Sequence, residues 1–269
     1  MKTDPADKTG IQAPTVTGLV LTCNGERLLE KCLFSLKFCD SLLLVDSGSS
    51  DGTERIATAA GARYIRNEWQ GFAAQFTYAA TLVETDWFFI LDQDEICSAE
   101  LAASIKQSMA AACGENAPIA FSVGRSSWYF DRFLHHSGWR PDHIPRLFKR
   151  GYVRFSQDAH IHYHPDGVCG HISAGDIIHY PYAGFAHQLA KLNMYAEQGA
   201  EFLRASAGKG GVLRGIGHGL AKFFRIYVLK AGFLDGRAGF LVAVHGAFYT
   251  FLKYVRVLQA SWGAPFDHK

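Results

Sequence analysis

Two carboxylates separated by a single residue, Asp92 and Asp94, follow directly after the apolar segment 87–91. Paired carboxylates at this spacing suit a hard divalent cation, which prefers oxygen ligands, and through it a diphosphate. Mg²⁺ or Mn²⁺ at this position would neutralise a nucleotide leaving group. Because turns are rich in Asp, the pair taken alone is more typical of an ordinary polar turn.

Two other polar segments, 22–24 and 46–53, also follow apolar stretches. In parallel α/β sheets, ligands bind beyond the carboxyl ends of the strands, so these segments and residues 92–95 are expected to meet in space. This convergence favours a binding site. The alternative for 46–53 is a solvated turn that caps a helix, with Ser50 or Asp51 as the cap.

Apolar runs alternate with helical patterns through the first hundred residues. Strands are predicted at 15–22, 42–45, 62–65 and 87–91, and helices around 28–36, 56–60 and 70–83. This alternation predicts an α/β fold with a Rossmann-like, mostly parallel central sheet flanked by helices. The aromatic- and His-rich stretch 117–182 predicts a mixed-sheet extension that closes over the pocket, and 185–205 predicts a helix.

Composition excludes several classes of protein. The 269 residues are 48% hydrophobic and 19% charged, which argues against a disordered chain, a collagen, a coiled coil or a disulfide mini-protein. The six cysteines form no C-x-x-C pair and indicate buried thiols in a reducing compartment. There is no G-x-G-x-x-G, P-loop lysine or G-x-S-x-G, so dinucleotide enzymes, kinases and serine hydrolases of that type are not expected.

The C-terminal quarter differs from the rest in charge. Residues 201–269 hold ten Lys and Arg against three acids, a net charge of +7, which leaves about −5 for residues 1–200. Two amphipathic patterns lie in this region, and the longest apolar stretch, 239–252, is shorter than a membrane span and contains His245. The pattern predicts helices that lie on an anionic cytoplasmic membrane surface without crossing it. The alternative is that they cover the sheet; no motif for nucleic acid accompanies the charge, so no nucleic-acid partner is expected.

Several motifs together resemble the family 2 inverting glycosyltransferases with a GT-A fold. The resemblance is carried by Leu-Thr-Cys-Asn at 21–24, Leu-Val-Asp-Ser-Gly-Ser-Ser-Asp-Gly-Thr at 44–53 and Leu-Asp-Gln-Asp-Glu at 91–95. The bacterial lipopolysaccharide-core β-glucosyltransferases are the branch most similar, through Trp-Gln-Gly-Phe at 69–72, Gly-Trp-Arg-Pro-Asp at 138–142, Arg-Leu-Phe at 146–148 and Lys-Ala-Gly-Phe-Leu-Asp-Gly at 230–236. The resemblance extends over residues 16–258, nearly the whole chain.

The resemblance implies a function and a division of the chain. A polar tail would occupy 1–14, a GT-A domain 15–205, and membrane-associating amphipathic helices 206–269. The enzyme would transfer a sugar, glucose from UDP-glucose, onto a lipopolysaccharide-core or related glycolipid acceptor and invert the anomeric configuration. It would be peripheral on the cytoplasmic face of the bacterial cell membrane. Mg²⁺ or Mn²⁺ would bind Asp92 and Asp94, and the nucleotide sugar would contact Thr22, Asn24, Glu26, Asp46, Gly48, Asp51, Gln75, Asp92 and Arg146.

The resemblance also implies a carboxylate base that deprotonates the acceptor hydroxyl. Where the family often has Val-His-Glu, this chain has Ala-His-Ile at 159–161, so Asp142, Asp158 and His162 are the candidates. Gln-Phe-Thr at 75–77 likewise replaces Gln-Lys-Asn. These departures motivate an alternative, a catalytically altered nucleotide-sugar-binding protein of envelope assembly. His179 is a candidate further metal ligand, or else a core histidine bonded to the backbone.

Overall fold

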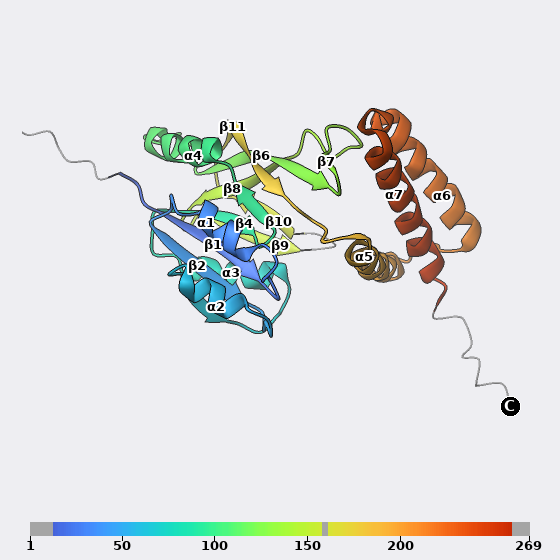
Figure 1. The fold of residues 1–269 in the computed structure, drawn as a ribbon, viewed down its shortest axis with the longest axis horizontal. Helices are drawn as coiled ribbons and strands as arrows, with labels where there is room; N and C mark the ends of the chain where they lie inside the picture. Colours follow the sequence, from blue (N-terminus) through green and yellow to red (C-terminus); the bar gives the residue numbers. More distant parts are fainter. Residues whose placement is uncertain (1–12, 158–160, 260–269) are drawn as a thin grey trace, which may run out of the picture.

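A computed structural model describes residues 13–157 and 161–259, which form a central sheet with helices on both faces and a helical extension (Figure 1). The strands are β1 (Val16–Thr22), β2 (Ser41–Asp46), β3 (Arg63–Arg66), β4 (Trp87–Asp92), β5 (Glu95–Cys97), β6 (Ala120–Tyr129), β7 (Arg132–Phe133), β8 (His143–Lys149), β9 (Val153–Gln157), β10 (Ile161–Pro165) and β11 (Cys169–His179). The helices are α1 (Leu29–Ser35), α2 (Thr53–Ala59), α3 (Phe72–Thr81), α4 (Ala99–Ala111), α5 (Phe185–Ala205), α6 (Val212–Phe224) and α7 (Gly236–Arg256), with a π-turn η1 (Arg225–Leu229) and a 3₁₀ turn η2 (Gly232–Asp235) between α6 and α7. The predicted α/β class is confirmed.

The first half of the sheet is parallel and aligns the three polar segments. Strands run in the order β3-β2-β1-β4, and all three neighbouring pairs are parallel. The register pairs Thr22 with Asp46 and Leu21 with Asp92. The carboxyl ends of β1, β2 and β4 therefore lie at one edge, where sequence analysis placed the site.

The second half of the sheet is mixed, so parallel pairing is confined to part of the predicted sheet. Strand β8 runs antiparallel to both β4 and β6, while β11 is parallel to β6 and antiparallel to β5. The order β4-β8-β6-β11 brings Arg146 of β8 and His179 of β11 toward the end of β4. This mixed part is the extension predicted for residues 117–182.

Two apolar layers hold the sheet between its helices. On one face, α1, α2 and α4 bury Leu33, Ala57 and Ile105 against strand residues such as Phe89. On the other face, α3 and the β9–β10 hairpin pack around Phe76. Burial of large apolar side chains contributes about 1.5–3 kcal/mol each to stability, so both faces are held firmly.

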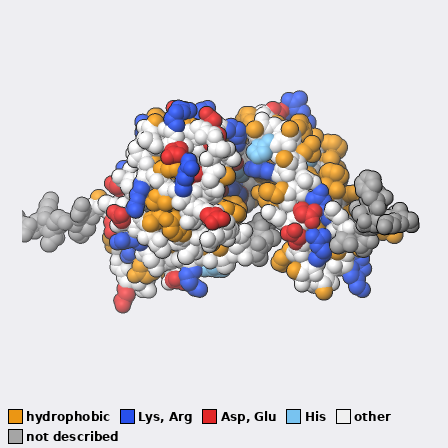
Figure 2. All heavy atoms as spheres, turned by 90° about the horizontal axis from the view of Figure 1, so that it is seen from below, with side chains coloured by type: hydrophobic (Ala, Val, Ile, Leu, Met, Phe, Trp, Pro, Cys, Tyr) orange, Lys and Arg blue, Asp and Glu red, His pale blue; other side chains and the backbone are white. Residues whose placement is uncertain are grey.

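The C-terminal helices pack on one another and on α5 beside the sheet, and do not cover its faces (Figure 1). Helix α6 meets α7 through small residues: a Cβ on Gly215 would lie 3.0 Å from the carbonyl oxygen of Phe251, and one on Gly219 would lie 3.1 Å from that of Ala247. The apolar side of α6 therefore faces outward. Figure 2 shows hydrophobic side chains gathered on this part of the molecule with Lys and Arg among them.

The expectation that no segment is long enough to cross a membrane is corrected here. The helix over Gly232–Arg256 has 25 residues and a mean hydropathy of 1.3 in its most apolar window, which suffices for a span by length and composition alone. The expectation rested on uninterrupted apolar residues alone. Helix α7 by itself runs over Gly236–Arg256 and so includes Arg237, Lys253 and Arg256 on either side of the apolar stretch 239–252.

Candidate active site

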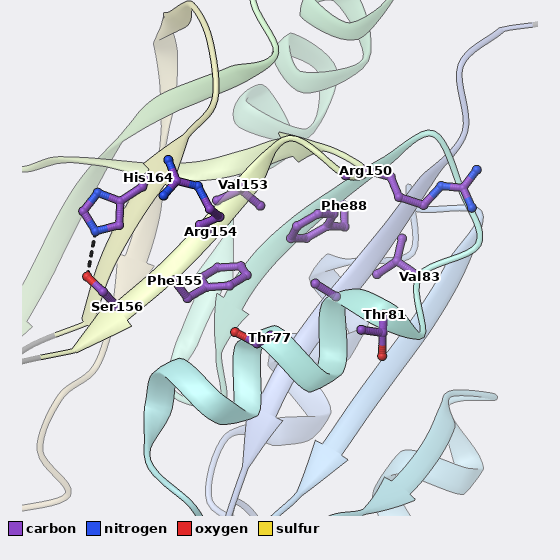
Figure 3. A pocket seen from close by; sticks show the side chains of 12 residues that line it. Thr77, Thr81, Val83, Phe88, Arg150, Val153, Arg154, Phe155, Ser156 and His164 are labelled. Atoms are coloured by element: carbon purple, nitrogen blue, oxygen red, sulfur yellow. Dashed lines mark hydrogen bonds between the residues drawn. The ribbon is translucent and has the colours of Figure 1, made fainter.

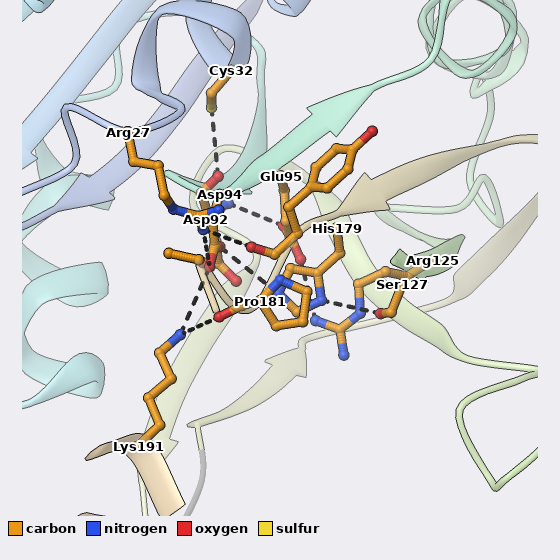
Figure 4. Close-up of polar contacts among 12 residues, drawn as sticks. Arg27, Cys32, Asp92, Asp94, Glu95, Arg125, Ser127, His179, Pro181 and Lys191 are labelled. Carbon is orange, nitrogen blue, oxygen red and sulfur yellow. Dashed lines mark hydrogen bonds and ion pairs between the residues drawn. The ribbon is translucent and has the colours of Figure 1, made fainter. Parts of the chain in front are cut away.

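The end of β4 carries a cluster of charged side chains that includes Asp92, Asp94 and Glu95 (Figure 4). Arg146 is 3% exposed and donates from one terminal nitrogen to Asp92 Oδ2 at 2.7 Å and to both oxygens of Glu95 at 3.1 Å. Its Nε has no hydrogen-bond partner in the described part of the chain. Arg146, predicted as a donor contact, is thus the cation that positions Asp92.

Glu95, which sequence analysis did not name as a site residue, completes this cluster. Its side chain is fully buried and accepts hydrogen bonds from Arg146, from Arg125 at 3.2 Å and from the Asp92 amide at 3.0 Å. Arg125 also donates to Asp142 Oδ2 at 2.8 Å. A chain of alternating charges therefore links Asp142 to Asp92.

Asp94 lies in a separate and looser environment. Three nitrogens surround its carboxylate, at 3.9 Å (Arg27), 3.8 Å (Lys191 Nζ) and 3.8 Å (His179 Nε2). These separations exceed hydrogen-bond length. Arg27 and Lys191 instead donate to the backbone oxygens of Tyr180 and Pro181, at 2.6 and 3.0 Å.

The pKa values of this edge follow from burial and from neighbouring charges. Burial would raise the pKa of Asp92, but the Arg146 guanidinium holds it below its usual value. Burial raises the pKa of Asp94 despite the neighbouring cations. Burial also lowers the pKa of His179 to about 4, so the imidazole is neutral at pH 7. His179 Nδ1 lies 3.1 Å from Ser127 Oγ. When Nδ1 carries the proton and donates to this hydroxyl, Nε2 is unprotonated and its lone pair faces Asp94.

The predicted nucleotide loops are tied together by their own side chains. Asp46 is fully buried and accepts from the amides of Gly48 and Ser49 at 3.1 and 2.8 Å, and from Tyr64. These bonds lower its pKa against the opposing effect of burial. Asp46 therefore shapes the loop and leaves Gly48, with a φ of 105°, at its exposed turn.

The β1–α1 loop is joined to the same cluster. Asp51 accepts from the Glu26 amide at 3.0 Å, Glu26 accepts from the Gly52 amide at 3.2 Å, and Asn24 accepts from the Ser50 amide at 2.9 Å. Thr22 donates to Gln93 Oε1 at 2.5 Å. The structure thus brings together the six residues predicted from these two loops, and Gln93 connects them to the Asp92–Asp94 turn.

Among the residues predicted to contact the donor, Gln75 is the one whose placement differs most from the prediction. It is fully buried and donates to Ser47 Oγ and to the backbone oxygen of Asn67, each at 3.0 Å, while Asn67 donates to its carbonyl oxygen. A side chain with no exposed surface cannot touch a ligand here. Gln75 instead fixes the β2–α2 loop against the start of α3.

The three base candidates fall in different places. Asp142 is partly exposed and joined to the ionic cluster through Arg125. His162 alternates along β10 with Tyr163, whose hydroxyl meets Arg146, so His162 lies on the exposed face of the hairpin. Asp158 lies outside the described residues.

Cavities large enough to hold a small molecule lie at two places among the described residues. The larger, about 810 Å³, lies between α3 and the β9–β10 hairpin, where Val83 and Phe88 place it toward the start of β4 (Figure 3). It is therefore away from Asp92. The second, about 590 Å³, is bordered by Lys191, which reaches Asp94.

Comparison with known proteins agrees with this arrangement. A family model described as glycosyl transferase family 2 matches residues 19–168. The chain belongs to this family. It is therefore an enzyme of the glycosyltransferase class, with the central sheet and flanking helices that the GT-A resemblance implied.

Relatives match over most of the chain. The lipopolysaccharide core biosynthesis glycosyltransferase LpsC of Rhizobium meliloti is 27% identical, with 91% of this chain and 92% of that protein covered. An uncharacterized glycosyltransferase of Rickettsia bellii is 24% identical, with 91% and 87% covered. Among solved structures, glucosyl-3-phosphoglycerate synthase from Mycobacterium tuberculosis aligns with a TM-score of 0.47 at 16% identity, covering 74% of this chain and 82% of that one. A mannosyltransferase from Pyrobaculum calidifontis aligns with a TM-score of 0.46 at 16% identity, covering 98% and 80%.

Proposed function

We propose that this glycosyltransferase moves a sugar, glucose from UDP-glucose, onto a lipopolysaccharide-core or related glycolipid acceptor with inversion at the anomeric carbon. The observation that carries the proposal is the polar edge at the ends of β1, β2 and β4, where the partly buried Asp94 lies between Arg27, Lys191 and His179. Two cations and a carboxylate at one point suit a nucleoside diphosphate with its metal. The name of the relative LpsC supports the acceptor class.

A divalent cation fits between Asp94 and His179. Their facing atoms are 3.8 Å apart, too far for a hydrogen bond but less than twice a metal–ligand bond of about 2.1 Å. Among residues 13–157 and 161–259, no group of three or more His, Cys, Asp and Glu side chains is arranged to hold a metal. Mg²⁺ and Mn²⁺ sites commonly take one or two protein ligands and complete the shell with phosphate oxygens and water, so two ligands suffice. The cation would supply charge neutralisation of the departing diphosphate.

Asp142 is the base candidate that best fits the described residues. The acceptor hydroxyl oxygen would form a bond to the anomeric carbon as the bond to the UDP oxygen breaks, and the hydroxyl proton would pass to the Asp142 carboxylate. Arg125 holds this carboxylate at 2.8 Å and fixes its orientation. Arg27 and Lys191 would bind the diphosphate while it leaves.

The C-terminal helices would place the enzyme on the cytoplasmic face of an anionic membrane. Their exposed apolar side chains include Leu213 (85% exposed), Leu220 (67%) and Leu229 (68%). Apolar area of this extent, with basic residues beside it, is typical of an interfacial surface. We propose the division at about residue 205 on the same ground, with the catalytic part at 15–205 and the membrane-associating part at 206–269.

Calorimetric titration with UDP-sugars and with GDP-mannose, each with and without Mn²⁺, tests the donor site. We expect binding of one UDP-sugar that strengthens with Mn²⁺, and loss of that metal dependence in Asp94→Ala. Asp166→Asn removes a carboxylate that pairs only at the surface with Arg154 and is the matched control. No binding of any nucleotide sugar to the folded protein would contradict the proposal.

Transfer must be measured separately from binding. Metal-dependent binding without transfer or hydrolysis of the donor would identify the alternative, a catalytically altered nucleotide-sugar-binding protein. Asp142→Asn then assigns the base: we expect transfer to fall about 10²–10⁴-fold while UDP binds as before. An unchanged rate in Asp142→Asn would exclude it as the base.

A further inference from the structure

The cavity of about 590 Å³ lies between the catalytic sheet and the C-terminal helices. One wall is formed by Tyr129 and by the Ser137–Gly138–Trp139 turn, and the other by α5, α6, η1 and α7. In Figure 2 the surface is hollowed between these two parts, with blue and pale blue side chains in the hollow. Such a space at the junction of two regions is a common position for a ligand.

The walls of this cavity are fixed firmly. Asp235 is buried and accepts hydrogen bonds from the amides of His135 and His136 and from Ser137 Oγ at 2.7 Å. The Ser137 amide donates in turn to the backbone oxygen of Lys230 at 2.9 Å. The segments 138–142 and 230–236 singled out in the sequence thus meet here and hold the cavity open between them.

The charge of the cavity is one-sided. Four cations line it and no Asp or Glu does, among the residues that the structure describes. The cations are Lys191, Lys222, Arg225 and Lys230. Of these, only Lys191 has a described carboxylate within ion-pair distance, whereas most other arginines of the described chain are paired. Burial lowers the pKa of Lys222, and Arg225 and Lys253 lower it further, as expected of like charges held together without a counter-ion.

A buried amide supplies an independent indication of a ligand. Gln188 lines the cavity, is 4% exposed and donates to the Tyr129 hydroxyl at 2.7 Å, and that hydroxyl also lies 2.9 Å from His245 Nδ1. The carbonyl oxygen of Gln188 has no described partner. Whichever way the Gln188 amide is oriented, one of its two polar atoms has no hydrogen-bond partner among the described residues. A buried polar atom left unpaired is destabilising, and a hydroxyl-bearing ligand would supply its missing hydrogen bond.

The cavity also borders the reaction centre and offers surfaces that suit sugar rings. Lys191 lines it and lies 3.8 Å from Asp94 Oδ2. Trp139, Tyr182, Tyr195 and Tyr249 lie in its walls. Aromatic faces and hydrogen-bonding groups together are typical of carbohydrate sites. On the outer side of α6, exposed Leu220 and Phe224 flank Lys222 and Arg225 in sequence and face the proposed membrane.

We propose that this cavity is the acceptor subsite and that it takes an anionic saccharide, one whose phosphate or carboxylate is bound by Lys222, Arg225 and Lys230. A neighbouring hydroxyl of the same saccharide satisfies Gln188. The inference rests on the proposed glycosyltransferase function and specifies its acceptor as a negatively charged, lipid-linked sugar. The anion is held by α6, η1 and the residue after η1, while the acceptor hydroxyl points past Lys191 toward the polar edge of the sheet.

The test uses a water-soluble acceptor so that membrane binding does not enter. The probe is the core oligosaccharide released from rough lipopolysaccharide, compared with the same material after removal of phosphate, after reduction of carboxylates, and after both. With UDP-glucose as donor and the full chain as enzyme, we expect KM for the oligosaccharide to rise about tenfold or more when its anionic groups are removed. Loss on dephosphorylation alone assigns the anion as phosphate, and loss on reduction alone assigns it as carboxylate.

Two variants locate the effect on the protein. In Lys222→Gln/Arg225→Gln, KM for the charged oligosaccharide rises about tenfold or more, approaches the value for the uncharged one, and no longer depends on its charge. The control Lys31→Gln/Lys106→Gln removes two exposed cations from α1 and α4 and leaves both KM values unchanged. Gln188→Leu raises KM without changing the dependence on charge.

UDP binding separates this inference from the function on which it rests. If the double variant binds UDP as the wild type does and KM is the same for charged and uncharged oligosaccharides in both proteins, the anionic subsite is wrong and the transferase stands. If neither protein binds a nucleotide sugar, the proposed function has failed first. An equal rise in KM for charged and uncharged acceptors in the double variant would also overturn the anionic subsite.

Discussion

The polar edge of the sheet and the cavity beside the C-terminal helices use charge in opposite ways. At the edge, each charge has partners: Arg146 bonds Asp92 and Glu95, and Arg125 bonds Glu95 and Asp142. In the cavity, Lys222, Arg225 and Lys230 have no described carboxylate partner. A cluster that is neutralised from within is pre-organised before any ligand arrives, whereas a cluster of one sign requires an anion from outside.

The same contrast extends to apolar residues. Around the sheet, large side chains such as Phe76 and Phe89 are fully buried, while along α6 and η1 Leu213, Leu220 and Leu229 are more than 60% exposed. The glycine face of α6 packs on α7 and leaves the apolar side without a protein partner. The first region is complete in the isolated chain; for the second we propose an anionic, lipid-bearing partner.

Arg146→Met gives the largest expected effect, because it removes the central cation of the self-neutralised edge. It leaves Asp92 and the buried Glu95 without their shared donor, and truncating one partner of a buried charge network costs about 3–5 kcal/mol. We expect the free energy of unfolding, measured in urea, to fall by that amount. Arg154→Met breaks the surface pair with Asp166, and we expect a far smaller change because water screens exposed ion pairs. Equal effects in the two variants would mean that the edge is no more than a surface ion pair.

Gln75→Leu tests whether the nucleotide loops depend on buried polar bonds in the same way. Ser47 Oγ and the backbone oxygens of Asn67 and Glu68 would lose their donor, which costs about 1–3 kcal/mol. We expect lower stability together with weaker UDP binding, since the β2–α2 loop would loosen. The matched control is Gln70→Leu, an exposed glutamine just before α3. Full stability in Gln75→Leu would show that this amide is dispensable for the loop.

Only some residues of the polar edge could be predicted from the sequence. The strand ends at Thr22, Asp46 and Asp92 were predictable because apolar strand patterns and the polar residues after them are local signals. Glu95 and Arg125 were not, because their roles depend on β8 lying between β4 and β6, an order that no local pattern encodes.

Two further differences have the same origin. One of the two amphipathic patterns predicted in residues 201–269 forms helix α6, but the outward orientation of its apolar side follows from close packing of Gly215 and Gly219 on α7. Gln75 was expected to bind the donor because it lies next to the family motif, yet its amide is used by Ser47, Asn67 and Glu68. Tertiary contacts decided both outcomes.

His179 tests whether the edge keeps its imidazole neutral. Its folded-state pKa of about 4 lies below the usual 6.5, so the unfolded chain takes up a proton first as pH falls. Stability contributed by the neutral form is therefore present above pH 6.5 and is lost progressively between pH 6.5 and 4. Between pH 6.5 and 5, we expect wild type to lose about 1–2 kcal/mol more than His179→Gln, as measured by urea unfolding at each pH. His135→Gln, an exposed histidine, should follow wild type; a parallel decline in His179→Gln would contradict the low pKa.

Phe224→Ser tests the other side of the comparison, the exposed apolar surface. Phe224 is 53% exposed on α6 and would enter the headgroup region of a bilayer. Partial burial of one such ring is worth about 1–1.4 kcal/mol, so affinity for vesicles of phosphatidylcholine with phosphatidylglycerol should fall about five- to tenfold in a sedimentation assay. Stability in urea should not fall, because the ring has little protein to pack against.

Phe34→Ser is the control that makes this prediction specific. Phe34 is 67% exposed, more than Phe224, but it lies on α1 beside the sheet, on the part of the molecule that we describe as complete without a partner. We expect its loss to leave vesicle binding unchanged. Equal losses in the two variants would mean that exposed apolar residues anywhere on the molecule attract lipid, and the distinction between the two regions would then reduce to their charge. Added salt separates these cases further, since it weakens attraction to phosphatidylglycerol through the Lys and Arg of 206–269 and leaves the contribution of Phe224 in place.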